Sequence, residues 1–236
     1  MSAPAREPKP RVAVVTFPGS NDDGDAVLAL SGLGAEPVPV WHAERELPDV
    51  QAVVLPGGFS YGDYLRAGAL ARLAPVMDSV RALAADGGLV LGICNGFQIL
   101  CEAGLLPGVL RPNESLTFVC RDVPLTVERV DTPFTSRCEA GQTLTIPVKH
   151  GEGLWYADDE LYAELERRDQ IVLRYAEPCN GSVQEVAGVV NEHRNVMGLM
   201  PHPEHAVDPL LGSADGALVL ASLVDAARDR QPVLVR

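Results

Sequence analysis

The sequence has little positive charge. Its 236 residues include 19 Lys and Arg against 32 Asp and Glu, which gives a formal net charge of −13 at pH 7. A protein this acidic repels phosphate backbones and cannot release their counterions. We therefore expect no nucleic acid among its partners.

Long apolar runs are also missing. The longest stretch without a charged residue, 87–101, is shorter than the ~20 apolar residues of a membrane helix, and it contains Asn95 and Gln98. We therefore expect no contact with a membrane. Residues 1–10 are rich in Pro and Ala and lack the apolar stretch of a secretory signal, so we expect a short mobile tail.

Cysteines are few and widely separated. The five residues Cys94, Cys101, Cys120, Cys138 and Cys179 are odd in number and contain no C-x-x-C pair. This spacing argues against a disulfide framework and against a zinc knuckle, and it fits the reducing cytoplasm. The sequence also has no Walker-type phosphate loop, so we do not expect the chain to use ATP itself.

The first half of the sequence repeats one pattern of elements. Apolar runs at 12–17, 53–55 and 89–93 each end in a turn or elbow, and stretches with helical spacing follow at 22–33, 67–85 and 97–100. Such alternation predicts an α/β fold with a mostly parallel central sheet and helices on both faces, of the flavodoxin-like kind.

The second half has a different pattern. Short β-like runs at 123–130, 144–148, 171–175, 187–191 and 196–200 predict additional antiparallel strands, and helices are expected at 158–168 and 214–227. We find no internal repeat and no convincing linker. The prediction is therefore a single domain over residues 11–236.

The sharpest local signal is the G-x-C-x-G sequence of residues 92–96. It lies between an apolar strand and a helical stretch, which is typical of a nucleophile elbow. Flanking glycines would let the backbone turn sharply, and the helix N-terminus would favour a thiolate at Cys94. The alternative is a small buried cysteine without a catalytic role. The other four cysteines lack such surroundings, and we interpret them as structural or incidental.

A thiol nucleophile needs a base and a group that orients the base. His202 and Glu204 stand in M-P-H-P-E after an apolar run, and the two prolines should hold the segment extended, so that both side chains share a face. His150, two residues before Glu152, is a rival base that the sequence does not exclude. His42, His193 and His205 are expected at the surface.

The glycine-rich loop at 56–63 follows the second apolar strand. Its glycines would let main-chain amides approach a ligand closely, although a plain turn is an alternative. If the elbow is active, the backbone N–H groups of Gly58 and Asn95 would form the oxyanion hole that this chemistry requires.

These motifs resemble the class I, or triad, glutamine amidotransferases, and among them the glutaminase subunits of phosphoribosylformylglycinamidine synthases. The resemblance covers nearly the whole chain. It rests on the sequences at 17–21, 55–69, 92–98, 150–153, 180–182 and 201–204. The elbow and the H-x-E sequence mark the broad class, whereas the long loop at 55–69 is typical of this subgroup.

The resemblance implies Cys94 as nucleophile, His202 as acid and base, Glu204 as orienter of the imidazole, and Gly58 and Asn95 as oxyanion donors. Ser60, Arg66, Gln98 and His150 lie in loops that could contact the substrate, L-glutamine, or a partner. The sequence departs from the family pattern at Asp22, Cys179 and His205, which leaves the triad intact but puts local partner contacts in doubt.

The resemblance also implies partners: a large synthetase subunit that uses ATP and Mg²⁺, and a small third subunit. No metal and no cofactor is expected on this chain. Two other readings stay open at this point. One is a different cysteine hydrolase or stress-response protein of related architecture, and the other is a non-catalytic binding or assembly module.

Overall fold

The computed structural model describes residues 9–230. Most of the predicted tail, residues 1–8, and the last six residues of the predicted single domain, 231–236, lie outside the described residues. Within the described part no helix is both long enough and apolar enough to cross a membrane.

Five helices and eleven strands make up the described chain. The helices are α1 (Asp23–Gly32), α2 (Val76–Ala85), α3 (Asn95–Glu102), α4 (Asp159–Arg167) and α5 (Gly216–Arg228). The strands are β1 (Arg11–Thr16), β2 (Glu36–Trp41), β3 (Ala52–Leu55), β4 (Leu89–Ile93), β5 (Val109–Arg111), β6 (Val119–Val127), β7 (Thr143–His150), β8 (Leu154–Tyr156), β9 (Ile171–Tyr175), β10 (Val186–Val190) and β11 (Val196–Leu199).

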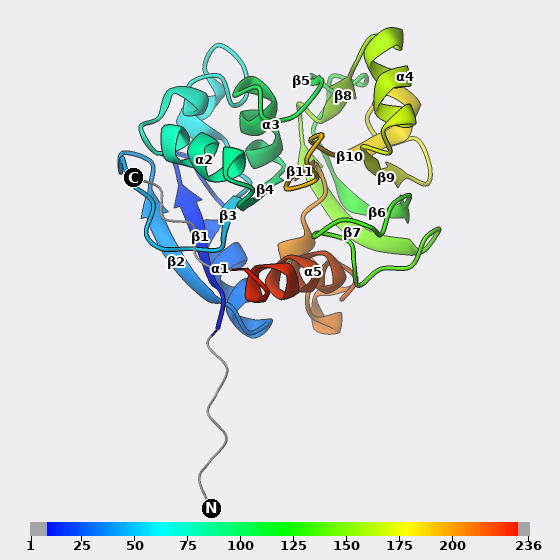
Figure 1. Cartoon of the computed structure of the whole chain (residues 1–236). Coiled ribbons are helices and arrows are strands. Elements are labelled where there is room, and N and C mark those ends of the chain that lie inside the picture. Colours follow the sequence, from blue (N-terminus) through cyan, green and yellow to red (C-terminus); the bar gives the residue numbers. More distant parts are fainter. Residues whose placement is uncertain (1–8, 231–236) are drawn as a thin grey trace, which may run out of the picture.

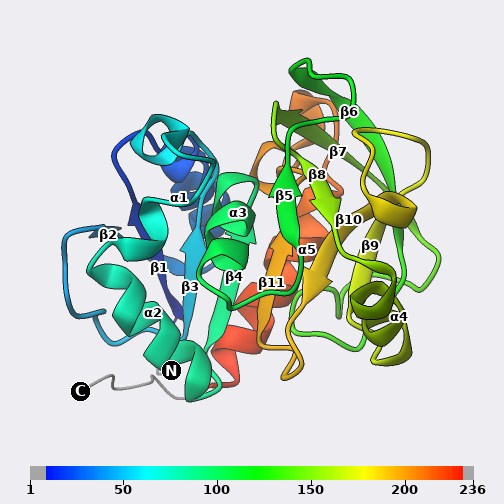
Figure 2. The same ribbon diagram turned by 90° about the horizontal axis from the view of Figure 1, so that it is seen from above.

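Nine of these strands form one sheet, in the order β2-β1-β3-β4-β11-β10-β9-β6-β7. The first five in this order are parallel to one another, and the last four are added antiparallel. Figure 2 shows the two halves side by side. The predicted parallel sheet with antiparallel additions is therefore confirmed. β5 and β8 form a separate antiparallel pair.

The parallel half is covered on both faces. Figure 1 shows α2 and α3 on one face of this half and α1 and α5 on the other. Every residue of β3 and β4 is buried, which explains why these strands are continuous apolar runs without alternation. Since parallel strands end at the same edge, the loops after β1, β3, β4 and β11 meet there.

The far end of the sheet returns to this edge. β7 is the ninth strand in the sheet order, yet Pro147 within it accepts a hydrogen bond of 2.8 Å from the backbone N–H of His202, directly beyond β11. The sheet therefore curls, and the C-terminal end of β7 lies next to the loops that end the parallel strands. Strand order alone would have separated them.

Two sequence expectations on elements were incomplete. The expected helix at 67–85 is divided into a 3₁₀ turn, Ala71–Leu73, and α2, because Ala74 precedes Pro75 and is extended at ψ 143°. β2 was not predicted, because Pro37 and Pro39 weaken a strand signal. The structure accommodates both prolines since β2 is an edge strand that pairs only with β1.

Candidate active site

Cys94 occupies a sharp elbow between β4 and α3. Its backbone lies at φ 49° and ψ −103°, a conformation that residues with a side chain rarely adopt and that costs free energy. The surrounding structure holds it there, since its N–H donates to the carbonyl oxygen of Leu199 in β11 at 2.8 Å. The elbow directs the side chain to the shared strand edge.

The elbow glycines are needed for space. A Cβ on Gly96 would lie 1.9 Å from the carbonyl oxygen of Leu55, and a Cβ on Gly92 would lie 2.6 Å from the carbonyl oxygen of Gly96. Neither glycine has a positive φ, so they permit the sharp turn, as expected, because they lack a Cβ. Cys94 itself carries the unusual backbone conformation.

His202 and Glu204 lie next to each other beyond β11. Nδ1 of His202 is 2.6 Å from Oε1 of Glu204, and both side chains are buried. Sequence analysis predicted that His202 and Glu204 share a face because the segment between them is extended. Instead Glu204 lies in a 3₁₀ turn, Pro203–His205, that brings its carboxylate back to the ring.

The charge of His202 is set by its neighbours. Burial alone would lower the pKa of its imidazole, but the negative charges of Glu204 and Cys94 outweigh it and raise the pKa to about 10. Nε2 is buried and makes no hydrogen bond of ordinary geometry with any described residue. A hydrogen bond with the Cys94 thiol is among the causes that raise this pKa, and Cys94 and His202 line one cavity. The arrangement favours an imidazolium ion.

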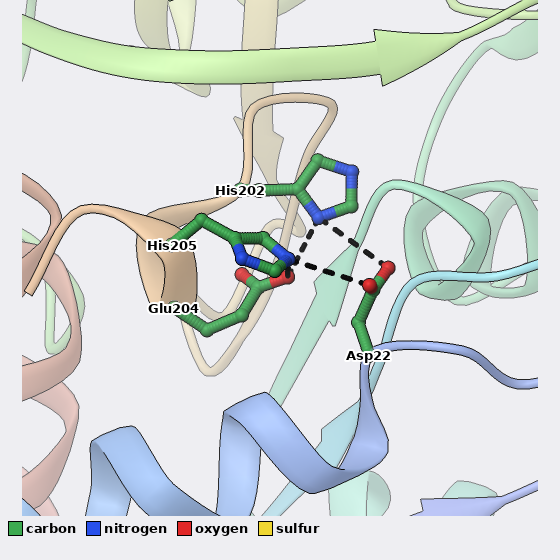
Figure 3. A group of neighbouring side chains, drawn as sticks. All are labelled: Asp22, His202, Glu204 and His205. Carbon is green, nitrogen blue, oxygen red and sulfur yellow. Dashed lines mark hydrogen bonds and ion pairs between the residues drawn. The ribbon is translucent and has the colours of Figure 1, made fainter. Parts of the chain in front are cut away.

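A second carboxylate, Asp22, faces the same imidazole (Figure 3). Its Oδ2 lies 3.6 Å from Nδ1 of His202, and its Oδ1 lies 3.3 Å from Nε2 of His205 and accepts a hydrogen bond from Lys149. Burial acts to raise the pKa of Asp22. The His205 hydrogen bond, the charge of His202 and the contact with Lys149 outweigh burial and lower this pKa to about 2.

These four groups are also the one set in residues 9–230 that could hold a metal ion. Asp22, His202, Glu204 and His205 each offer a ligand atom, and the four atoms lie within 4.8 Å of one another. The same atoms already pair with each other, and the Lys149 ammonium group neutralises Asp22. Oε2 of Glu204 is nevertheless buried without a hydrogen-bond partner among the described residues, so the pairing within the cluster is incomplete at this atom.

The two predicted oxyanion donors lie at the same edge. Gly58 lines the cavity that contains Cys94, and Asn95 begins α3 directly after it. Neither backbone N–H donates a hydrogen bond to another described residue. The Asn95 side chain links the two loops, because its Oδ1 accepts from the N–H of Ser60 at 3.1 Å. Both amides are free to bind a developing negative charge.

The cavity beside Cys94 is built by three segments. Gly58, Phe59 and Asp63 come from the loop after β3, and Cys94 and Gln98 come from the elbow and α3. Residues 149–152 comprise the last two residues of β7 and the two that follow it. Phe118 closes the remaining side. The Cys94 thiol, Gly58 and several polar side chains therefore line one small space, an arrangement that suits attack on a carbonyl group.

Comparisons with known proteins agree with this chemistry. The CobB/CobQ-like glutamine amidotransferase domain model matches residues 9–215. The chain is 57% identical to the PurQ subunit of phosphoribosylformylglycinamidine synthase from Rubrobacter xylanophilus, over 92% of this chain and 99% of that one. It is 55% identical to the same subunit from Corynebacterium jeikeium, over 91% and 96% of the two chains.

This chain belongs to the PurQ family of glutamine amidotransferases. A solved PurLQS structure from Thermotoga maritima matches it with a TM-score of 0.85 and 47% identity, over 92% of this chain and 98% of that chain. A glutamine amidotransferase of the same organism matches at 17% identity with a TM-score of 0.63, over 94% and 99% of the two chains, which shows the shared fold. The resemblance stated from the motifs is thereby confirmed.

Of the four residues predicted to contact substrate or a partner of this PurQ family member, two line the cavity and two do not. Gln98 and His150 line the cavity. Ser60 is buried beneath it, where its N–H meets Asn95. Arg66 does not line it, because its guanidinium group forms two hydrogen bonds of 2.5 and 2.6 Å with Glu102.

Sequence reasoning missed three charged residues of the site. Asp63 and Glu152 line the cavity, and Lys149 joins it to Asp22. Their signal was present, since Asp63 and Glu152 lie within the family motifs at 55–69 and 150–153, and Lys149 directly precedes the second motif. His205, expected at the surface, is only 28% exposed because it contacts Asp22. Of the three histidines expected there, only His193 is exposed, while His42 is half-buried and bonds Tyr61.

The three positions expected to depart from the family pattern fall into two groups. Asp22 and His205 contact each other beside His202, so these two positions form one cluster. Cys179 is half-buried and precedes Asn180, whose side chain donates to the carbonyl oxygen of Gly153. Like the other four cysteines, Cys179 forms no disulfide.

Proposed function

We propose that this chain is the glutaminase subunit of a phosphoribosylformylglycinamidine synthase, with Cys94, His202 and Glu204 as its catalytic triad. One observation carries the assignment of the triad. The buried imidazole of His202 is held at Nδ1 by Glu204, its Nε2 has no hydrogen bond of ordinary geometry with a described residue, and the ring lines one cavity with Cys94. This is the arrangement of nucleophile, base and orienter that acyl transfer requires.

The reaction begins with the sulfur of Cys94 adding to the carboxamide carbon of glutamine. The oxygen becomes negatively charged and accepts hydrogen bonds from the N–H groups of Gly58 and Asn95. The imidazolium of His202 gives its Nε2 proton to the nitrogen, which leaves as ammonia, and a γ-glutamyl thioester remains. His202 then takes a proton from water, hydroxide attacks the thioester, and glutamate and the thiolate are released.

The ammonia would pass to the partner subunit. We propose that a large ATP- and Mg²⁺-dependent synthetase uses it to convert formylglycinamide ribonucleotide to formylglycinamidine ribonucleotide in purine biosynthesis, with a small third subunit in the complex. The name of the Thermotoga maritima PurLQS structure supports these two partners. The five free cysteines support a reducing compartment, and we propose the cytoplasm.

No step of this cycle draws on a cofactor. The nucleophile, the proton carrier and the oxyanion donors are all groups of this chain, so we propose that ATP and Mg²⁺ act on the synthetase subunit alone.

The test is to assay the reconstituted complex with Cys94→Ala. Glutamine-dependent synthesis should be lost, while high ammonia should still support synthesis at the normal rate, because the synthetase is untouched. Cys101→Ala is the matched control, since this half-buried thiol lies about two turns beyond the elbow on α3, does not line the cavity and should tolerate replacement. Retained glutamine use by Cys94→Ala would refute the assignment.

A glutamine-like electrophile separates this function from a non-catalytic module of the same fold. It should label Cys94 selectively, and excess glutamine should suppress the labelling. Labelling of all accessible cysteines at similar rates, or labelling that glutamine does not slow, would favour the non-catalytic reading.

A further inference from the structure

Asp22 occupies the N-cap position of α1, yet its carboxylate makes no capping hydrogen bond. Its backbone starts the helix in the usual way, because its carbonyl oxygen accepts from the N–H of Ala26 at 2.9 Å. An aspartate at this position normally satisfies a free N–H group of the first turn with its side chain. Asp158 does so at the start of α4, where it accepts from the N–H of Leu161 at 2.9 Å. The side chain of Asp22 is therefore used for something other than the helix.

The carboxylate of Asp22 turns instead toward the imidazole of His202 (Figure 3). Its Oδ2 lies 3.6 Å from Nδ1 of the ring, and the side chain is buried. Gly57 packs against both groups, because a Cβ at this position would collide with the carboxylate and with the ring. The N–H groups of Asn21 and Asp22 donate to the carbonyl oxygen of Gly57 at 3.2 and 3.3 Å. The loop before α1, the loop after β3 and the ring are thus packed as one unit.

Two side chains hold the other oxygen of this carboxylate. The ammonium group of Lys149 donates to Oδ1 of Asp22, and Nε2 of His205 lies 3.3 Å from the same atom. Lys149 comes from β7 and His205 from the turn after β11, so two further segments fix the carboxylate. The carbonyl oxygen of Lys149 also lies 3.8 Å from Sγ of Cys94. The residue that anchors Asp22 therefore contacts the thiol as well.

The contact between Asp22 and His202 favours the imidazolium ion. Burial raises the pKa of Asp22, but the hydrogen bond with His205, the charge of His202 and the contact with Lys149 outweigh it and lower this pKa to about 2. Because an electrostatic interaction is reciprocal, the carboxylate that the imidazolium keeps ionised in turn keeps the imidazolium protonated.

Other titratable groups surround the ring on every side. Burial and the charge of His202 lower the pKa of one of them, His150, to about 4, so its imidazole is neutral at pH 7 and adds no charge. The remaining groups are Glu204 and His205 on the turn after β11, Cys94 on the elbow, Lys149 on β7, and Cys120 and Asp122 on β6. Among these, the carboxylate of Glu204 shares Nδ1 with Asp22.

We propose that Asp22 is a positioning residue for the imidazole of His202, which it holds at Nδ1 together with Glu204. The inference rests on the proposed glutaminase function, because it assigns a role in the proton transfers of His202. Asp22 acts through the ring: it keeps Nδ1 directed at the carboxylates and favours the charged form that gives its Nε2 proton to the leaving nitrogen. Lys149 and His205 hold Asp22 at the longer distance, so Glu204 remains the direct partner.

The first test measures the imidazole of His202 directly. The full chain, with isotope-labelled histidine, is titrated by NMR from about pH 6 to about pH 11, a range that includes the ring's pKa of about 10. His202→Ala identifies the signal among those of the five histidines. Asp22→Asn should lower this pKa by about one pH unit, as expected when an opposite charge beside the ring is removed. A chelator is present throughout, so that no divalent cation contributes.

The second test is a double-mutant cycle in the reconstituted complex. Asp22→Asn should lower the kcat for glutamine about 10-fold with the KM nearly unchanged, because the ring is less firmly placed. The basic limb of the kcat/KM profile should move to lower pH. In a Glu204→Gln background the same substitution should cost more than in wild type, because Asp22 then supplies the remaining negative charge at Nδ1.

Asp25→Asn is the matched control. This carboxylate lies in the first turn of α1 and 3.9 Å from Nε2 of His205, but it is not paired with His202. Its removal should leave kcat and the pKa of His202 unchanged. Asp22→Ser is a second variant that protects the fold, because serine is also a good N-cap residue and carries no charge. It should lower the pKa of His202 as Asp22→Asn does.

Two results would overturn the proposal. One is a pair of Asp22 variants that unfold more easily but keep the wild-type pKa of His202 and the wild-type pH profile, which would make Asp22 a structural residue only. The other is a cycle in which the losses from Asp22→Asn and Glu204→Gln are simply additive. Failure of the glutaminase function would look different, because the wild-type complex would then hydrolyse no glutamine, whereas NMR would still report the pKa of His202.

Discussion

Oδ2 of Asp22 lies 3.6 Å from Nδ1 of His202, the ring nitrogen that also lies 2.6 Å from Glu204. The imidazole of His202 thus faces two carboxylates at the same ring nitrogen. Lys149 and His205 hold Asp22 at this longer distance through its other oxygen. Glu204 therefore remains the direct partner of the ring, and Asp22 adds negative charge behind it.

Asp22 should stabilise the fold above acidic pH. Its folded-state pKa of about 2 is below the usual 3.8, so its ionised form favours the folded state at pH values above 3.8, and this contribution is lost as pH falls toward 2. Asp22→Asn should lower the free energy of unfolding by about 2 kcal/mol at pH 7. Urea unfolding at pH 7 and pH 3 should show a smaller difference at pH 3. An unchanged difference would contradict the assigned ion pairs.

His202 and His150 should differ sharply as bases. His202→Ala should lower the glutaminase kcat by roughly 10²- to 10⁴-fold, because it removes the group that carries the proton. His150→Ala should mainly raise the KM for glutamine, since the imidazole is neutral and bound to Asn113. Steady-state kinetics of both variants shows which histidine acts as the base. A greater loss of kcat in His150→Ala than in His202→Ala would reverse the choice.

Gly57 should be essential for the position of the imidazole. A Cβ there would lie 2.3 Å from Oδ2 of Asp22 and 2.6 Å from Cε1 of His202. Gly57→Ala should therefore displace the ring and lower glutamine-dependent activity by at least about 10-fold, with ammonia-dependent activity retained. Gly32→Ala, where the new Cβ meets no atom within 4 Å, is the control. Equal activity of the two variants would show that the ring position is not critical.

Gly96 should be required for the elbow to fold. Its Cβ would lie 1.9 Å from the backbone oxygen of Leu55, so Gly96→Ala should lower the free energy of unfolding by about 3 kcal/mol. Gly24→Ala in α1 meets nothing within 4 Å and should instead stabilise the protein by about 0.5 kcal/mol. Chemical denaturation of both variants measures the two changes in the free energy of unfolding. A Gly96→Ala variant as stable as wild type would contradict this prediction.

The local order of the chain was readable because each element depends on nearby residues. The apolar runs in the sequence correspond to β3 and β4. The spacing of Gly92, Cys94 and Gly96 predicted the elbow between β4 and α3. His202 and Glu204 are two residues apart, so their contact was also within reach of sequence reasoning.

The sequence by itself determined the elbow of Cys94, the proposed nucleophile, with its flanking glycines and the histidine–glutamate pair, because short-range spacing and residue type specify them. Only the tertiary structure decided that β7, ninth in the sheet, curls back so that Pro147 meets His202, and that Asp22 and Lys149 join across the site. These contacts arise from the curvature of the sheet and from the meeting of strand ends. Both features depend on the combined packing of many residues. The spacing of residues along the chain therefore does not predict these contacts.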